Sequence, residues 1–456
     1  MNTTNEKFVE AISHNDDSEQ VEMVYDPKQK KSSFARLRDG KVEYLDQITL
    51  PSGQTIRPWS STNSLISYGF IKLPSVAEDY DRERNLYEET LGFVNSHVAL
   101  PRSFASVSAL YAMMSWLYDG FHALPYLRVI GASGTGKTTF LQTVGNLCYK
   151  GMFASGSTSL AALFRTIDHV QGTFVFDEAD FRASEMSNDI TKVLNSGYQA
   201  EFPVLRMEVD PRNDKILRER AFNIFGPKVI ASRARFHDEA LETRCLTQIM
   251  PIRSKLKTPL VQPATFDSQA LSLRNKLLTF RFRHMHDNFR AEHELKGIEV
   301  PRLKQILAPL MHVSQMVGAD VQLELIKYAQ ALEADMKQEL LRSPEADVLM
   351  CLLVLIQENK SHGEDKIHIQ QVADEFNRRY IRDYRGDPLP DVQNERDLVR
   401  QGYYISAKKA GTIIARKLMI KTKQDGHGYY IPPAEHKRIA QLGERYGITE
   451  DMITNS

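Results

Sequence analysis

Residues 126–140 read YLRVIGASGTGKTTF, and this stretch decides the fold. The mostly apolar residues 126–130 predict a buried β-strand, and the letters after them fit the spacing G-x-x-x-x-G-K-T of a phosphate-binding loop. Glycines let successive backbone N–H groups turn inward around phosphate oxygens without a Cβ clash. A helix expected from about 138 to 147 adds the positive end of its dipole. The alternative is a glycine-rich strand-to-helix turn with a chance lysine.

The loop predicts a site for ATP and Mg²⁺. Lys137 is expected to reach the β- and γ-phosphates, and the Thr138 hydroxyl is expected to bind magnesium. The residues that we expect around the nucleotide are Gly131, Ser133, Gly134, Thr135, Gly136, Lys137, Thr138 and Thr139.

A second apolar strand is expected at 172–176, and it ends in the acids Asp177 and Glu178. Asp177 is expected to hold the magnesium through its water shell. Glu178 points the other way, so it could orient and deprotonate the attacking water. A strand end followed by a solvated acidic turn would read the same, but the position after a phosphate loop favours hydrolysis. Two adjacent acids also argue against a nucleotide kinase, which needs no hydrolytic base.

Three more residues are candidates for catalysis. Ser232 ends the apolar stretch 225–232 and could touch the γ-phosphate or the attacking water, or be a simple strand terminus. Arg244 ends a short helical stretch and cannot easily reach its own nucleotide. It is either a surface arginine or a finger that acts on a neighbouring subunit, which can be worth ~10³–10⁵ in rate. Arg302 begins a helix and could close a lid onto the phosphates, or simply be solvated.

The order of these parts resembles the AAA+ ATPases. More narrowly, residues 111–310 resemble the minichromosome-maintenance-like helicases and the primase-helicases of mobile genetic elements. The segments that carry the resemblance are PYLRVIGASGTGKTT, FVFDEAD, VLNSGYQ, FGPKVIAS, DEALETRC and LRNKLLTFRFR. There are two departures from the family pattern: no cysteine-rich zinc module lies near the N-terminus, and Ser232 stands where family members often carry asparagine.

An insertion precedes Ser232. Residues 203–222 hold two partly alternating stretches around the turn sequence PRND, which predicts a β-hairpin. In the helicases that the chain resembles, a hairpin at this place projects into the pore of a ring and tracks the DNA backbone. The resemblance therefore implies DNA contacts by Arg206, Arg212 and Lys215. A charged hairpin tip that is only solvated is the alternative.

The C-terminal segment resembles a winged helix-turn-helix. Helices are expected at about 346–358, 371–380 and 406–418, and the turn DGHG at 425–428 reads as a wing. Residues 401–438 hold eight lysines and arginines against two acids, and phosphate contacts require such a local excess. The DNA contacts expected here are Lys408, Lys409, Arg416, Lys421 and Lys423. A winged helix that contacts protein inside an assembly is the alternative.

Composition limits the possible partners and compartment. Lysine plus arginine and aspartate plus glutamate both total 58 of the 456 residues, so any nucleic-acid surface must be local. The start is polar and no apolar run approaches the roughly 20 residues of a membrane span, which predicts a cytoplasmic protein without a membrane partner. The three cysteines are far apart and form no metal or disulfide pattern.

The expected fold class is α/β, with an AAA+ P-loop parallel sheet. The expected parts are an N-terminal β-rich module at 1–75, a helical connector at 76–124, an ATPase core at 125–255, a helical lid at 256–340 and a C-terminal winged-helix DNA-binding domain at 341–456.

These parts predict an ATP-hydrolysing ring helicase or DNA translocase, a homo-oligomer of six subunits that replicates a mobile genetic element. Two other functions stay open. An initiator or loader would use ATP as an assembly switch without unwinding DNA. A defence or signalling ATPase would remodel protein, with residues 1–75 as its partner site. Strand separation distinguishes the first alternative, and DNA stimulation of the ATPase distinguishes the second.

Overall fold

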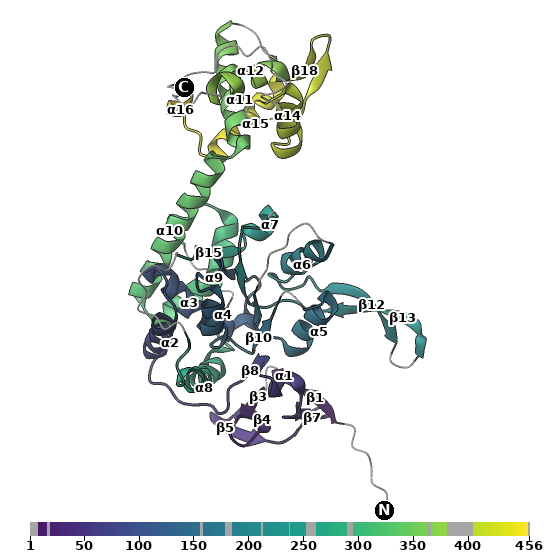
Figure 1. Ribbon diagram of the computed structural model, residues 1–456, viewed down its shortest axis with the longest axis vertical. Coiled ribbons are helices and arrows are strands. Elements are labelled where there is room, and N and C mark those ends of the chain that lie inside the picture. Colours follow the sequence, from purple (N-terminus) through teal and green to yellow (C-terminus); the bar gives the residue numbers. More distant parts are fainter. Residues whose placement is uncertain are drawn as a thin grey trace, which may run out of the picture. The chain divides into compact units, whose positions relative to one another are not determined.

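The computed structural model describes residues 8–15, 19–155, 158–177, 185–210, 213–236, 238–251, 261–289, 295–362, 366–380 and 405–454. The chain divides into two compact units, Met1–Gln330 and Ala331–Ser456 (Figure 1). Each unit has its own apolar core. In the part of the chain that the structure describes, no helix is long and apolar enough to cross a membrane.

A six-stranded sheet forms the centre of the first unit. Its strands lie in the order β15 (Cys245–Ile249), β9 (Tyr126–Ile130), β14 (Lys228–Ser232), β11 (Phe174–Phe176), β10 (Gly151–Ala154) and β8 (Ile71–Lys72). The first five strands run parallel, and β8 pairs antiparallel with β10. Parallel strands are covered on both faces and are therefore apolar along their length, and β9, β11 and β14 are buried throughout. The predicted α/β fold with a parallel sheet is confirmed.

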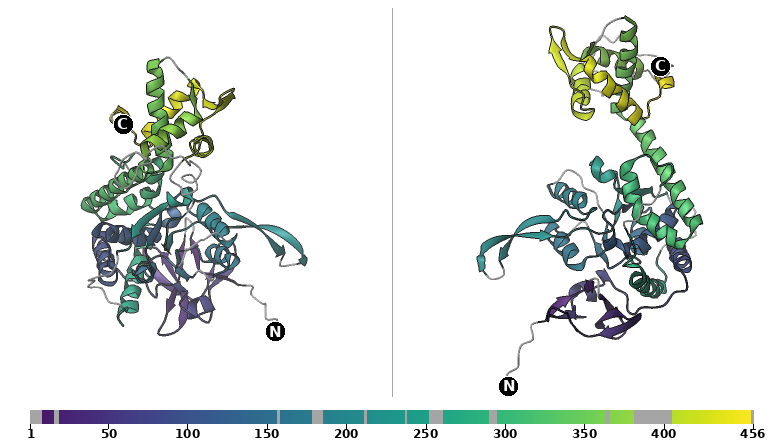
Figure 2. Two further views of the ribbon diagram at one scale, coloured as in Figure 1. Left: turned by 45° about the horizontal axis from the view of Figure 1, so that its top comes forward. Right: turned by 180° about the vertical axis from the view of Figure 1, so that it is seen from behind.

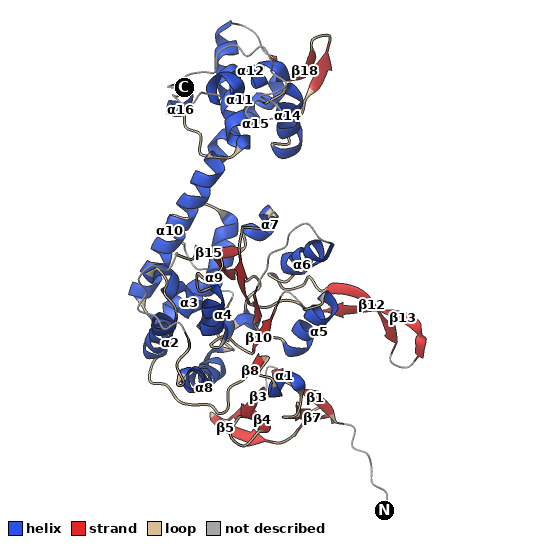
Figure 3. Cartoon of the chain, in the orientation of Figure 1, coloured by secondary structure: helices blue, strands red, loops and turns tan. Residues whose placement is uncertain are grey.

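Helices surround this sheet in Figure 3, where they are blue and the strands red. The helix α4 follows the phosphate loop and contacts β9, β10, β11 and β14, while α2 and α3 pack on each other and on α9. The helices of this unit, of which the last continues into the second unit, are α1 (Ser64–Ser67), α2 (Glu83–His97), α3 (Arg102–Ser115), α4 (Lys137–Gly145), α5 (Leu160–Val170), α6 (Glu185–Ser196), α7 (Glu239–Glu242), α8 (Phe266–His284), α9 (Pro301–Val317) and α10 (Ala319–Leu341).

The N-terminal region folds as two small sheets. The first has the order β2 (Ser13–Asn15), β3 (Gln20–Asp26), β4 (Lys31–Arg38) and β5 (Lys41–Leu45). The second has the order β1 (Val9–Ala11), β7 (Thr55–Pro58) and β6 (Ile48–Thr49). Asp39 and Gly40 form the turn between β4 and β5 with φ of 50° and 74°, because a two-residue hairpin turn of this kind needs positive φ at both positions.

This region is joined to the six-stranded central sheet. Its last strand, β8, completes the six-stranded sheet, and its apolar side chains belong to the same buried cluster as those of β9, β10 and β11. The sequence signals of residues 1–75 are local turns and strands, so they could not predict this continuity.

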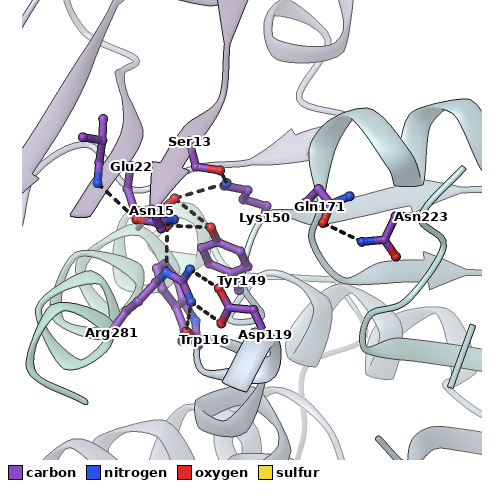
Figure 4. A network of polar contacts seen from close by, with 11 residues as sticks. Ser13, Asn15, Glu22, Trp116, Asp119, Tyr149, Lys150, Gln171, Asn223 and Arg281 are labelled. Carbon is purple, nitrogen blue, oxygen red and sulfur yellow. Dashed lines mark hydrogen bonds and ion pairs between the residues drawn. The ribbon is translucent and has the colours of Figure 1, made fainter. Parts of the chain in front are cut away.

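A buried polar network also fixes the N-terminal sheet to the core (Figure 4). Glu22 on β3 is 1% exposed and accepts hydrogen bonds from Tyr149 Oη and Arg281 Nε, each at 2.7 Å. Lys150 lies 3.1 Å from the same carboxylate and donates to Ser13 Oγ at 2.7 Å. Burial alone raises the pKa of Glu22, but the two cations outweigh it and hold the pKa below its ordinary value of 4.5.

We expect Glu22→Gln to lower the free energy of unfolding by about 3–5 kcal/mol, because it leaves Lys150 buried without its carboxylate partner and Arg281 with Asp119 alone. The measurement is urea unfolding as a function of pH. Since folding lowers the pKa of Glu22, its contribution is complete above pH 4.5 and is lost as the pH falls through the folded value.

The matched control is Glu43→Gln on β5, in the same sheet. Glu43 pairs with Arg36 at 2.8 Å, but its side chain is 49% exposed. Its loss should leave the free energy of unfolding nearly unchanged, because an exposed ion pair contributes little. Equal losses from both variants would contradict the role given to the buried network.

The second unit contains helices and a small three-stranded sheet of order β16, β18, β17. Its elements are α11 (Pro344–His362), β16 (Ile367–His368), α12 (Ile369–Tyr380), α14 (Ala407–Thr412), β17 (Lys423–Asp425), β18 (Gly428–Ile431), α15 (His436–Arg445) and α16 (Glu450–Thr454). The helix expected at 406–418 is α14 followed by a π-helical turn at Ile413–Lys417. The expected turn at 425–428 joins β17 and β18.

Candidate nucleotide site

The phosphate loop leaves the carboxyl end of β9 and leads into α4. Gly134 and Gly136 have φ of +80° and +94°, a backbone conformation that glycine adopts without a Cβ penalty. A Cβ on Gly131 would lie 2.6 Å from Thr135 Oγ1, so a larger residue would displace that side chain. The backbone conformation therefore favours glycine at positions 134 and 136, and the lack of space for a Cβ favours it at position 131.

Lys137 lies across this loop at the first position of α4. Its Nζ donates hydrogen bonds to the backbone oxygens of Gly131 at 2.7 Å and Ala132 at 2.9 Å. These contacts keep the ammonium group beside the loop amides, where a cation can neutralise phosphate charge.

Thr138 and Asp177 come together from distant parts of the chain. Thr138 Oγ1 donates to Asp177 Oδ2 at 2.8 Å. Asp177 follows β11, which lies next to β14 and one strand away from β9, so both groups are at the carboxyl edge of the sheet. Ligands of open α/β sheets bind at this edge. A hydroxyl and a carboxylate are oxygen donors that suit Mg²⁺, so the pair fits the predicted metal.

Ser232 ends β14 beside the loop, opposite Ile130 in the strand register. The residue is 1% exposed, and its Oγ donates to the backbone oxygen of Ala234 at 2.8 Å. Its backbone oxygen accepts from Gly131 N at 3.2 Å. In this conformation the backbone oxygen of Ser232 supports the loop, and its hydroxyl is hydrogen-bonded to the backbone of Ala234. Glu178, the predicted base, lies outside the described residues.

Arg244 lies at the other edge of the sheet. It directly precedes β15, and its backbone oxygen accepts from Tyr126 N, at the start of β9, at 2.8 Å. The loop follows the end of β9, four residues further on, which corresponds to about 13 Å along a strand. Arg244 is 8% exposed, and its Nη1 donates to the backbone oxygen of Asn195 at 3.0 Å and to the Asn195 side chain.

Arg302 lies with Arg244 and not at the phosphate loop of its own chain. Its Nη1 donates to Tyr198 Oη at 2.9 Å, and its guanidinium carbon is 5.2 Å from the centre of the Tyr198 ring. The backbone oxygen of Tyr198 accepts from Leu124 N, just before β9. In this conformation a phenol at the amino edge of the sheet binds the guanidinium, and the closing of a lid onto the phosphates by Arg302 stays a prediction.

Sequence reasoning missed the partners of these arginines. Asn195 and Tyr198 lie in the segment VLNSGYQ, which contains no charged residue that would indicate a partner for an arginine. A charged residue inside the apolar run YLRVI, Arg128, could have indicated a buried polar contact. It is fully buried on β9, where it binds Glu242 of α7 with both terminal nitrogens and Thr247 with Nε at 3.0 Å. This pair fixes α7, and with it the position of Arg244.

The strands β12 (Val204–Asp210) and β13 (Asn213–Phe222) form an antiparallel hairpin over the range where the sequence predicts one. It extends away from the sheet in Figure 1 and in both views of Figure 2. The hairpin contacts α5, because Glu208 pairs with Arg165 of that helix at 2.7 Å and the Arg206 guanidinium lies 5.5 Å from the Phe164 ring. Arg212 lies outside the described residues, and so does the side chain of Lys215.

The cations predicted to bind DNA in the second unit share one exposed stretch of chain. Between them, Ala410, Ile413 and Ile414 are buried, so the cations lie on the outer side of α14 and the turn after it. The exposed cations are Lys408, Lys409, Arg416, Lys421 and Lys423. In the β17–β18 turn, the backbone N–H of His427 holds the pKa of Asp425 at about 2, with help from His368 and Lys366.

No protein-family model and no curated protein sequence match the chain. Among solved structures, it resembles an active helicase, SCCmec type IV Cch, with 12% identity over 94% of this chain and 97% of that one, at a TM-score of 0.39. It also resembles the C-terminal region of NrS-1, with 10% identity over 90% and 95%, at 0.34. JCV helicase matches with 13% identity over 55% and 60%, at 0.24. At such values, functional conclusions rest on the residues of the site.

Proposed function

We propose that this chain is an ATPase that moves along or separates DNA as a ring of identical subunits, most simply six, in the replication of a mobile genetic element. The observation that supports this most is the 2.8 Å contact between Thr138 and Asp177 beside Lys137. It lies at the carboxyl edge of a parallel sheet that also carries a projecting hairpin.

The proposed hydrolytic site uses residues of one chain to bind ATP. The loop amides and Lys137 bind the phosphates, and Thr138 with Asp177 would hold Mg²⁺, which supplies neutralisation of the phosphate charge when bound. Glu178 follows Asp177 directly and is proposed as the base that deprotonates the attacking water.

The position of Arg244 supports a shared site between subunits. About 13 Å of strand separates it from the loop of its own chain, so it would serve a nucleotide held by a neighbour. Such a site exists only in an assembly, and successive head-to-tail contacts of this kind close into a ring.

Two surfaces are proposed for DNA. The hairpin around Arg212 would follow the strand as hydrolysis changes the subunit interface. The second unit would bind a duplex or fork as a winged helix, through the exposed cations that begin at Lys408. The helices over 256–340 would act as the lid of the ATPase core.

Unwinding of a forked DNA duplex, with and without ATP, tests this function. We expect ATP-dependent strand separation and an ATPase that DNA stimulates. DNA-stimulated hydrolysis without strand separation would favour an initiator or loader. An ATPase indifferent to DNA would favour a protein-remodelling role. Lys137→Ala is the control that must abolish every ATP-dependent signal.

Reversing the charges of the hairpin tip, with Arg212→Glu and Lys215→Glu together, should abolish unwinding while basal ATPase remains. The strands β12 and β13 extend away from the sheet that carries the phosphate loop, and Arg212 falls between them in the sequence. The matched control reverses Lys28 and Lys30, exposed in the β3–β4 turn. Normal unwinding by the hairpin variant would refute this role.

Replacing Lys408, Lys409 and Arg416 with alanine should weaken DNA affinity and reduce its salt dependence. Each lost phosphate contact lowers the slope of log K against log salt by about 1. The control removes three exposed cations of the same unit that lie outside residues 401–438, Arg342, Arg378 and Arg445. Binding titrations at several salt concentrations measure both, and an unchanged slope for the first variant would exclude these contacts.

A further inference from the structure

Tyr198 occupies a firmly held position at the amino edge of the sheet. It follows α6, and its backbone oxygen accepts from Leu124 N at 2.8 Å. The preceding residue, Gly197, is held from the sheet side, because its backbone oxygen accepts from the buried Lys228 Nζ at 2.9 Å. The Tyr198 side chain itself is 7% exposed. The ring is therefore a rigid surface and not a mobile loop residue.

Both candidate catalytic arginines contact this one ring. The guanidinium carbon of Arg244 lies 3.9 Å from the ring centre, which is a close cation–π contact. The guanidinium carbon of Arg302 lies 5.2 Å from the same centre. Arg244 follows α7 and Arg302 lies at the start of α9. The Tyr198 ring therefore links two separate elements, because it contacts one arginine from each.

The hydroxyl of Tyr198 both accepts and donates a hydrogen bond. It accepts from Arg302 Nη1 at 2.9 Å and donates to Gln199 Oε1 at 2.7 Å. A phenol has one proton to give, so the donation to Gln199 directs its oxygen lone pairs toward the arginine. The free lone pair of the hydroxyl oxygen therefore favours a hydrogen-bond donor, such as the guanidinium of Arg302, on that side of the ring.

Arg244 keeps binding capacity in this arrangement. Its Nη1 donates to Asn195, and a guanidinium stacked on an aromatic face can still donate hydrogen bonds from its edge. Among the described residues, Arg244 Nε is buried and has no hydrogen-bond partner. A buried donor without a partner costs free energy, so the ring and Asn195 do not use all the hydrogen-bonding groups of Arg244.

We propose that Tyr198 is a positioning residue that holds Arg244 and Arg302 as one pair, so that both cations face the nucleotide of the neighbouring subunit together. This inference rests on the proposed function, in which Arg244 acts on that nucleotide. The ring sets the place of Arg244, and the hydroxyl sets the place of Arg302. Tyr198 itself touches no phosphate.

Two substitutions separate the ring from the hydroxyl. Tyr198→Phe keeps the ring and removes the hydroxyl acceptor of Arg302, which retains its bond to Gln305 at 2.9 Å. It should therefore lower kcat for ATP measurably, but by no more than Arg302→Ala does. Tyr198→Leu removes both contacts and should lower kcat about as much as Arg244→Ala, by ~10³-fold or more. The KM for ATP should change little in either variant, because the phosphate loop lies at the other edge of the sheet.

A double-mutant cycle distinguishes positioning from general packing. Tyr198→Phe combined with Arg302→Ala should be no slower than Arg302→Ala alone, since the hydroxyl then has nothing left to hold. Additive losses would show that the hydroxyl acts elsewhere and would overturn that part of the proposal. The control is Tyr87→Phe, which removes another buried hydroxyl, bound to Ser106 Oγ at 2.7 Å, and should leave kcat unchanged.

The same variants keep the two proposals apart. If Arg244→Ala is impaired while folded Tyr198→Leu hydrolyses ATP at the normal rate, the positioning role is wrong and the shared site stands. If Arg244→Ala itself is normal, the shared site fails first and Tyr198 positions nothing that catalysis needs. If Tyr198→Leu does not fold, Tyr198→Phe and its cycle with Arg302→Ala still decide the role of the hydroxyl.

Discussion

Replacing Lys137 with alanine should abolish ATP turnover, with a loss of nucleotide affinity or of hydrolysis too large to leave a measurable rate. The ammonium group lies within 2.9 Å of two loop oxygens, so it is already placed beside the phosphate cradle. Alanine leaves the charge on the β- and γ-phosphates without this cation. Steady-state hydrolysis and binding of a fluorescent ATP analogue measure the two effects separately.

Glu178→Gln provides the contrast for this prediction. It keeps the loop and its cation intact, so it should bind ATP and hydrolyse it slowly, since loss of a general base costs ~10²–10⁴ in rate. Near-normal turnover by Lys137→Ala would mean that the glycine-rich turn binds no nucleotide. Near-normal turnover by Glu178→Gln would remove only the base assignment.

Arg244→Ala should suppress hydrolysis by ~10³-fold or more while ATP affinity stays close to normal. Arg244 lies at the amino edge of the sheet and the loop at the carboxyl edge, so one chain cannot use both for the same nucleotide. The measurements are ATP binding and steady-state turnover of the assembled protein.

Mixing the variants tests whether Arg244 acts between subunits. Arg244→Ala and Glu178→Gln are each inactive alone, but a mixed ring contains junctions where an intact Glu178 meets an intact Arg244. Such mixtures should recover part of the activity. If mixed assemblies form and no ratio restores turnover, Arg244 acts within its own chain or has a structural role.

The local parts of the site were predictable from the sequence because their chemistry depends on neighbouring residues. The glycine spacing before Lys137 requires a particular backbone, and Asp177 follows an apolar strand. Alternating strands and helices also predict a parallel sheet, whose carboxyl edge brings such residues together. The contact between Thr138 and Asp177 follows from these rules alone.

The long-range polar contacts were not predictable in this way. Glu22 binds Arg281, 259 residues further along the chain, and Tyr198 binds Arg302 across 104 residues. Nothing in the local pattern of either partner specifies the other. For this reason the sequence could not show that residues 1–75 are joined to the central sheet, or that Arg302 contacts Tyr198.

The short strand β8 has a consequence for any shortened form of this protein. Only Ile71 and Lys72 form it, and they cover the outer side of β10. A chain trimmed to begin at residue 76 would lose this cover and present the free backbone of β10 as a template for other chains. Short edge strands and lysines are two of the means by which proteins prevent sheet-to-sheet aggregation, and β8 combines both. The N-terminal segment thus shields the edge of the six-stranded sheet from pairing with other chains.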